Sequence, residues 1–99
     1  LVVSNTITPN GDGNNDLFFI ENMNQQIYSS SLLTIINRWG NEVYSVTNYG
    51  LNDNWWDGKT KYKGEELTTG VYYYILDVFN IIHNQKESYS GNVTIFHDD

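Results

Sequence analysis

The sequence predicts an all-β domain, and three observations lead to this prediction. Runs of β-branched and aromatic residues recur along the chain, and clusters of Gly, Asn and Asp separate most of them. The run Tyr89–Phe96 alternates between two sets of residues in the two-residue period of a strand, and no stretch has a clear 3.6-residue helical period. The predicted strands are Leu1–Val3, Leu17–Ile20, Leu32–Asn37, Glu42–Val46, Val71–Phe79 and Tyr89–Phe96.

The segments between these strands indicate turns and connections. Gly40-Asn41 predicts a tight hairpin turn within Arg38–Glu42. The polar segment Glu21–Ser31 is expected to be a connection, with room for a short edge strand. Three lysines alternate with Thr60 and Tyr62, so a strand there would project their ammonium groups to one side. We expect this strand to blunt a sheet edge, the alternative being a docking site for an acidic partner. The lysines are Lys59, Lys61 and Lys63.

The segment Thr68–Tyr74 refines the fold class. Its Tyr72 has the position of a tyrosine corner, in which a hydroxyl near the start of a strand bonds to the backbone upstream. Tyr74 then stands where antibody domains place their second cysteine, and in a chain without cysteine it must pack instead. The strand count and the length predict an Ig-like antiparallel β-sandwich of about seven strands. Its centre is expected to hold one of the tryptophans Trp39, Trp55 and Trp56.

Length and composition limit the class of protein. The 99 residues suffice for one domain with one core, so residues 1–99 are predicted to form a single, monomeric domain. The net charge of −7 argues against nucleic-acid binding, which needs a basic surface. No apolar run approaches the ~20 residues of a membrane-spanning helix. Because the chain begins at Leu1 without a signal peptide, we expect it to be part of a longer protein.

Residues suited to catalysis are few, and the sequence predicts that the domain is not an enzyme. His83 and His97 lie in an expected hairpin turn and at the end of the last strand, and each is interpreted as a surface histidine. Asp53 and Asp57 could flank a sugar, but no apolar surroundings mark either carboxyl as a proton donor.

The loop Thr8–Asp16 contains a candidate calcium site. Oxygen-bearing side chains occupy every second position of this loop, as in calcium-binding loops. A glycine is missing at the sixth position of an EF-hand-like register, and no flanking helices are expected. We therefore favour a turn in which these side chains cap backbone N–H groups, and no cofactor is expected to be required. Ca²⁺ remains the alternative, with the ligands Asn10, Asp12, Asn14 and Asp16.

Five ordered segments extend over nearly the whole chain, and together they are more specific than any one alone. In chain order they are Thr8–Gly13 with Asn15-Asp16, Ile35–Gly40 with Val43-Tyr44, Trp56–Gly58, Gly70–Tyr74 and Gly91–Ile95. These segments resemble a known family, the gliding-motility-associated C-terminal domain of Bacteroidetes, which is also described as the type B C-terminal sorting domain of the type IX secretion system.

This resemblance implies an Ig-like domain that ends a large adhesin or secreted protein and acts as its export signal. It implies passage through the periplasm and the outer membrane to the cell surface or medium. The implied partners are the type IX machinery and an outer-membrane protein of the PorP/SprF type, and no catalytic residue is implied. A physical route to such recognition is addition of a partner's strand to the first or last strand, including Tyr89–Phe96.

A competing hypothesis is a carbohydrate-binding or adhesive sandwich module, with calcium as a structural ion. Its stacking platform would be Trp55 and Trp56 with nearby tyrosines. Neighbouring residues of one strand face opposite sides, so one of these two tryptophans is expected in the core.

Overall fold

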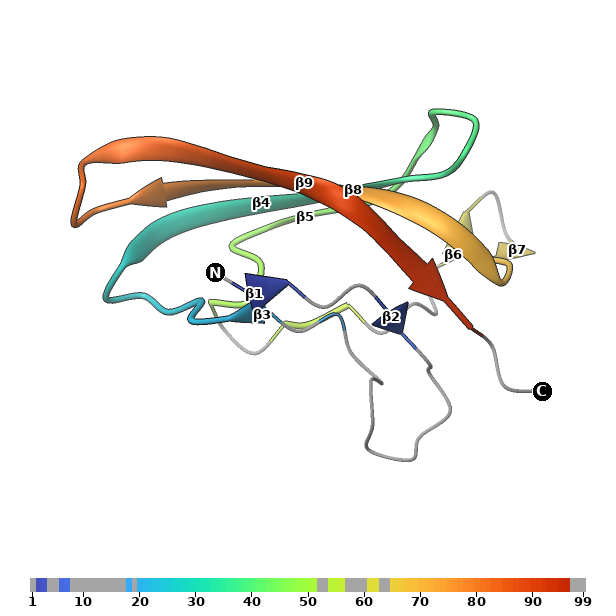
Figure 1. Cartoon of the computed structure of the whole chain (residues 1–99), viewed down its shortest axis with the longest axis horizontal. Coiled ribbons are helices and arrows are strands. Elements are labelled where there is room, and N and C mark those ends of the chain that lie inside the picture. The colour runs from blue at the N-terminus through green and yellow to red at the C-terminus, as the bar shows by residue number, and fades with distance from the viewer. Residues whose placement is uncertain are drawn as a thin grey trace.

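The computed structural model describes residues 2–3, 6–7, 18, 20–51, 54–56, 61–62 and 65–96, and these residues are all-β (Figure 1). A five-stranded sheet dominates, with the strand order β2-β9-β8-β4-β5. Its strands are β2 (Thr6–Ile7), β4 (Tyr28–Ile36), β5 (Glu42–Thr47), β8 (Gly70–Asn80) and β9 (Gln85–Ile95). The smaller two-stranded sheets pair β1 (Val2–Val3) with β3 (Ile20–Glu21) and β6 (Lys61–Tyr62) with β7 (Glu65–Glu66).

The hairpin of β8 and β9 forms the centre of the large sheet. The two strands pair antiparallel from Gly70 with Ile95 to Asn80 with Gln85, without a register shift. Asn80 shapes the turn that joins them, because its Oδ1 accepts hydrogen bonds from the backbone N–H groups of Ile82 and His83, at 2.9 and 3.1 Å. Such side-chain bonds satisfy turn amides that have no strand partner.

Two strands are longer than the sequence predicts. The last strand begins at Gln85 rather than at Tyr89, because its polar first residues pair with the end of β8. Likewise β4 begins at Tyr28, so the connection predicted over Glu21–Ser31 ends at Ile27. In both places backbone pairing with β8 overrides a polar sequence that carries little strand signal.

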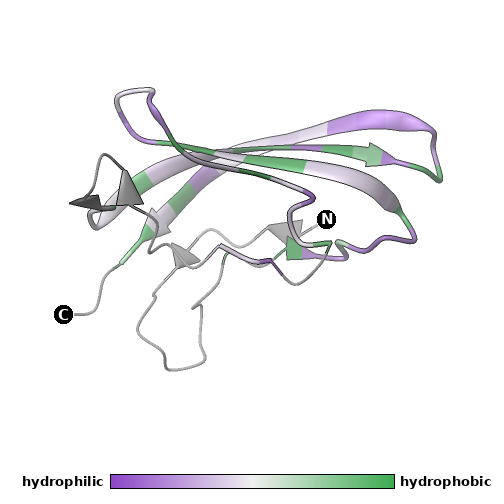
Figure 2. Cartoon of the chain, turned by 180° about the vertical axis from the view of Figure 1, so that it is seen from behind, coloured by the Kyte–Doolittle hydropathy of each residue, from purple (hydrophilic) through white to green (hydrophobic). Residues whose placement is uncertain are grey.

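The core lies against one face of this sheet. Hydrophobic and hydrophilic bands alternate along its strands (Figure 2). On the inner face Leu33 of β4 pairs with Leu76 of β8, and Val93 of β9 pairs with Tyr72; the three aliphatic side chains are fully buried. Strict alternation lets each strand bury one row of side chains and expose the other.

A second layer covers the inner face, where β1 and β3 lie beneath the large sheet (Figure 1). Its buried side chains include Phe18, Ile20, Tyr49 and Trp56. Phe18 contacts Trp56 edge-on, with ring centroids 6.3 Å apart, and the Trp56 ring stacks on Tyr44 of β5. The domain core is therefore mainly aromatic on one side and aliphatic on the other.

Hydrogen bonds to Tyr49 join the two layers. Its hydroxyl donates to the backbone oxygen of Phe18 at 2.6 Å and accepts from the backbone N–H of Trp56 at 2.8 Å. Its own backbone oxygen accepts from the hydroxyl of Ser31 on β4, at 2.7 Å. Because the Tyr49 side chain is fully buried, water cannot replace these bonds.

The sheet arrangement differs in detail from the predicted seven-stranded antiparallel sandwich. The described part of the chain has nine strands in three sheets, and β2 runs parallel to β9. The large sheet combines four antiparallel strands with this fifth, two-residue strand. Among the described residues of the second layer, Phe18 and residues 54–56 are irregular, and only β1 and β3 form strands. The all-β class is confirmed, while two full facing sheets are not found among the described residues.

The predicted tyrosine corner is confirmed. The hydroxyl of Tyr72 donates to the backbone oxygen of Thr68 at 2.9 Å. This bond fixes the chain where it enters β8. The predicted hairpin turn at Gly40-Asn41 is also present between β4 and β5, and Gly40 has a φ of 85°, which glycine adopts without strain.

We expect Tyr49→Phe to lower the free energy of unfolding by about 2–4 kcal/mol, since it leaves a buried carbonyl and a buried N–H without their partner. Urea unfolding followed by tryptophan fluorescence measures this change. Tyr73→Phe is the matched control, because Tyr73 is 48% exposed and its loss should stay within about 0.5 kcal/mol. Equal stability of the two variants would contradict the role given to the Tyr49 hydroxyl.

Candidate recognition surface

The tip of the β4–β5 hairpin presents an exposed tryptophan on a rigid turn. Asn37, which is buried, accepts hydrogen bonds through Oδ1 from the backbone N–H groups of Trp39 and Asn41, at 3.0 and 2.9 Å. The Trp39 side chain is 70% exposed, and the guanidinium carbon of Arg38 lies 4.3 Å from its ring centroid. A held aromatic ring beside an arginine is typical of binding hot spots.

Gly91 creates a close contact on the inner face of the sheet. It pairs with Tyr74 of β8, and a Cβ added to Gly91 would lie 2.9 Å from the Tyr74 ring. The half-buried Tyr74 ring also packs against Phe18, with centroids 5.4 Å apart. Desolvation in this position raises the pKa of the Tyr74 phenol above its ordinary value. The expectation that Tyr74 packs instead of a cysteine is confirmed.

The two adjacent tryptophans separate as predicted, since only Trp56 enters the core. Trp56 is 2% exposed, while Trp55 is half-buried. The Trp55 ring meets Tyr49 edge-on and passes over Gly50, where an added Cβ would lie 2.7 Å from it. Trp55 is thus partly engaged in packing, and the exposed tryptophan of the described surface is Trp39.

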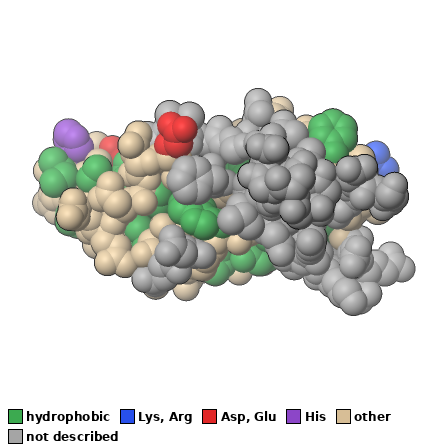
Figure 3. Space-filling view, turned by 90° about the horizontal axis from the view of Figure 1, so that it is seen from below, with side chains coloured by type: hydrophobic (Ala, Val, Ile, Leu, Met, Phe, Trp, Pro, Cys, Tyr) green, Lys and Arg blue, Asp and Glu red, His purple; other side chains and the backbone are tan. Residues whose placement is uncertain are grey.

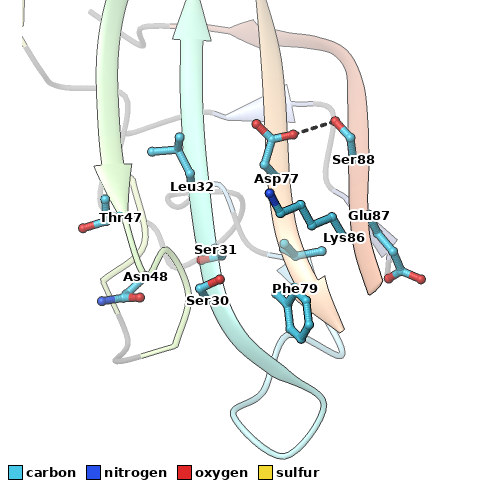
Figure 4. A pocket seen from close by; sticks show the side chains of 11 residues that line it. Ser30, Ser31, Leu32, Thr47, Asn48, Asp77, Phe79, Lys86, Glu87 and Ser88 are labelled. Carbon is cyan, nitrogen blue, oxygen red and sulfur yellow. Dashed lines mark hydrogen bonds between the residues drawn. The ribbon is translucent and has the colours of Figure 1, made fainter. Parts of the chain in front are cut away.

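An open groove of about 710 Å³ crosses the outer face of the large sheet near the β8–β9 turn (Figure 4). The hydroxyl of Ser88 donates to the carboxylate of Asp77 at 2.7 Å within it. The remaining lining consists of hydroxyl, amide, apolar and charged side chains, most of them from β4, β5, β8 and β9. The sequence alone did not predict this groove. Its lining is Ser30, Ser31, Leu32, Thr47, Asn48, Asp77, Val78, Phe79, Lys86, Glu87 and Ser88.

The outer face also carries a row of exposed apolar side chains along β8. Val71, Tyr73 and Ile75 are 46%, 48% and 36% exposed. On the face seen from below, the described hydrophobic side chains are visible as separate spots among backbone and other side chains (Figure 3). The apolar row lies near the start of β8, and Trp39 lies in the β4–β5 turn. Both are at the same end of the large sheet, because Ile36 at the end of β4 pairs with Tyr73.

The predicted calcium ligands Asn10, Asp12, Asn14 and Asp16 lie outside the described residues, and the calcium prediction remains untested. Within the described ranges, no three His, Asp or Glu side chains are grouped to hold a metal ion. His83 is exposed in the β8–β9 turn, as predicted.

The lysine strand is confirmed in part. Its backbone forms β6 at Lys61–Tyr62, which pairs with Glu65–Glu66. The remaining candidates of the sequence analysis, Asp53, Asp57, Lys59, Lys63 and His97, lie outside the described residues.

These features define a small β domain with an exposed tryptophan at a hairpin tip and a row of exposed apolar side chains along β8. The family described as CHU_C type IX secretion signal domain matches residues 1–95, so the chain belongs to this family. The resemblance found in the sequence is thereby confirmed. Comparison with curated proteins and with solved structures gave no significant match.

Family membership assigns the domain the role of a C-terminal sorting signal, with the type IX secretion system as its partner. It also implies export of the protein that carries the domain to the cell surface or beyond. No helix in the described part of the chain is long and apolar enough to cross a membrane.

We expect Gly91→Ala to lower the free energy of unfolding by about 1–3 kcal/mol, because the new methyl group displaces the packed Tyr74 ring. A double-mutant cycle with Tyr74→Leu isolates this contact. With the ring removed, Gly91→Ala should cost nothing or stabilise the strand slightly, since alanine is the better strand residue. An equal loss in both backgrounds would show that the close approach to Tyr74 is unimportant.

Proposed function

We propose that the domain is a non-catalytic export signal whose folded surface is recognised by the type IX machinery and by an outer-membrane partner of the PorP/SprF type. The observation that carries this proposal is the family match over residues 1–95. The cargo would pass through the periplasm, cross the outer membrane and stay on the surface. Its carrier would be an adhesin or secreted protein of a gliding member of the Bacteroidetes.

The geometry supports recognition of a folded domain. Two of the family segments, at Asn37–Gly40 and Gly70–Tyr74, contribute the residues that surround a small hollow at one end of the sheet. Within it Asn37 and Tyr72 are buried supports, while Trp39 and Val71 are exposed. Supports of this kind hold exposed side chains in a fixed arrangement, which lowers the entropic cost of binding.

The finer fold proposed is a variant of the Ig-like sandwich. Its support is the tyrosine corner at Tyr72 and the layer that covers the inner face of the large sheet. In this interpretation the irregular second layer replaces a complete second sheet.

A fluorescent protein carrying residues 1–99 at its C-terminus tests the proposed function. In a cell with a type IX system, we expect the fusion to reach the surface or medium. The same fusion should stay inside a strain whose translocon is deleted, and the fluorescent protein alone should stay inside both. Retention of the fusion in the competent strain would reject the proposal, provided that the fusion is intact and folded.

The competing proposal, a carbohydrate-binding or adhesive module, has weaker support. The two tryptophans of its predicted stacking platform do not form one exposed surface. Trp56 is in the core, and the half-buried Trp55 packs against Tyr49. Binding to a glycan array that disappears with Trp55→Ala would favour this module over the export signal.

The calcium site is tested separately by thermal or urea unfolding with and without a chelator. We expect the free energy of unfolding to be unchanged, since the loop side chains are proposed to cap backbone N–H groups. A bound ion supplied at a hundredfold its dissociation constant would instead add about 2.7 kcal/mol. A loss above about 1 kcal/mol on chelation would therefore assign Ca²⁺ to Asn10, Asp12, Asn14 and Asp16.

A further inference from the structure

One side of β9 is open along most of its length. The strand pairs with β8 from Gln85 to Ile95, but β2 covers its other side only at Thr94 and Ile95. Within the described ranges, no further strand pairs with Gln85–Val93 on that side. Every second residue of an antiparallel strand turns its N–H and C=O away from the paired neighbour. Among the described residues, the backbone donors and acceptors along this edge therefore have no strand partner.

Beyond Lys86 and Glu87, which lie beside the β8–β9 turn, the open edge lacks the features that usually prevent strand addition. Sheet edges are normally blunted by lysine, proline, bulges or very short strands. Residues 88–93 contain no charged residue and no proline, and the eleven pairs of β8 with β9 contain no bulge. At the opposite side of the sheet, β5 is only six residues long and its pairing with β4 has an irregularity at Ile35 and Ile36. The β9 edge is thus the longer and more regular of the two.

The side chains of β9 specify what kind of strand would fit beside it. On the outer face the row is Ser88, Ser90 and Asn92, which are exposed and polar. On the inner face Tyr89 and Gly91 are half-buried and Val93 is fully buried. Gly91 adds no side chain between Tyr89 and Val93. A strand laid along this edge would place one row of side chains beside these apolar residues and the other row beside hydroxyl and amide groups.

We propose that an extended segment of a partner protein adds to the sheet along Gln85–Val93, with apolar residues in its inner row and polar residues in its outer row. This inference rests on the proposed function, since the partner would belong to the secretion machinery. Pairing of two copies through the same edge is disfavoured, because each domain carries a net charge of −7 and two copies repel one another. The uncharged stretch Ser88–Val93 suits a neutral strand, and the acidic domain around it suits a partner with basic surroundings.

Pairs of charge-changing substitutions at the two sides of the sheet test this inference in the export assay. Ser90→Lys with Asn92→Lys places two positive charges on β9. Glu42→Gln with Ser45→Lys changes the net charge by the same amount on β5, outside the groove of the outer face. All four native side chains are exposed. We expect the β9 pair to reduce export of the fusion at least tenfold and the β5 pair to leave it within twofold. Thermal midpoints equal to that of the parent fusion exclude misfolding as the cause.

The outcomes separate the two proposals. If the parent fusion is not exported, the proposed function fails. If the parent is exported and the β9 pair is exported equally well, strand addition at β9 is wrong while the export function stands. The same conclusion holds if the β9 pair and the β5 pair reduce export to the same degree. A dimer of the isolated domain that dissociates with the β9 lysine pair would show that the edge pairs copies of this chain, and would also overturn the proposal.

Hydrogen exchange gives a direct readout of the bound domain. When the domain binds a purified outer-membrane protein of the PorP/SprF type, strand addition should slow exchange at least tenfold at alternate amides of Gln85–Val93. Amides that already bond to β8 serve as internal controls, because their exchange is slow before binding. A bound domain whose edge amides still exchange at the free rate would contradict the inference.

Discussion

The buried hydroxyl of Tyr49 is the constraint on which the two-layer arrangement depends. It bonds to the backbone of Phe18 and of Trp56, two segments that lie 31 and 7 residues away along the chain. The two segments also bond to each other directly, since the backbone N–H of Phe18 donates to the backbone oxygen of Trp56 at 2.7 Å. The Tyr49 hydroxyl adds two further bonds to this backbone pair and so ties both segments to one buried side chain. Because the site is dry, the two bonds also fix where the Phe18 and Trp56 rings meet the sheet.

The family segments divide into supporting and exposed parts. Gly91 admits the Tyr74 ring, and Asn37 holds the turn that presents Trp39. Tyr72 fixes the start of β8, from which Val71 and Tyr73 point outward. The exposed residues Trp39, Val71 and Tyr73 therefore lie within two positions of a residue that fixes their backbone. This explains how short segments can specify both a fold and a surface within one small domain.

The sequence predicts those parts of the fold whose signal is local. The Tyr72 corner and the Gly40 turn follow from turn chemistry, and both are found. One residue of the Trp55-Trp56 pair is buried as predicted, although these residues lie in irregular chain and not in the strand on which the prediction relied. The early part of β9, from Gln85, is polar and pairs only because β8 lies beside it, so no local pattern marks it. Tyr49 was not predicted either, because its partners are brought near by tertiary packing alone. The groove on the outer face was not predicted for the same reason, because tertiary packing brings its lining together from four strands.

The open edge and the folding of the domain are connected through the β8–β9 hairpin. The two strands are joined by a short turn, so their pairing needs only local contacts, which form early in folding. The twist and position of this edge, however, depend on β4 packing against β8 and on the aromatic layer beneath. A partner strand that adds to β9 would therefore meet a complete edge only after the core has formed. Recognition through this edge would select folded domains, because an unfolded chain offers the same side chains without an aligned row of backbone donors and acceptors.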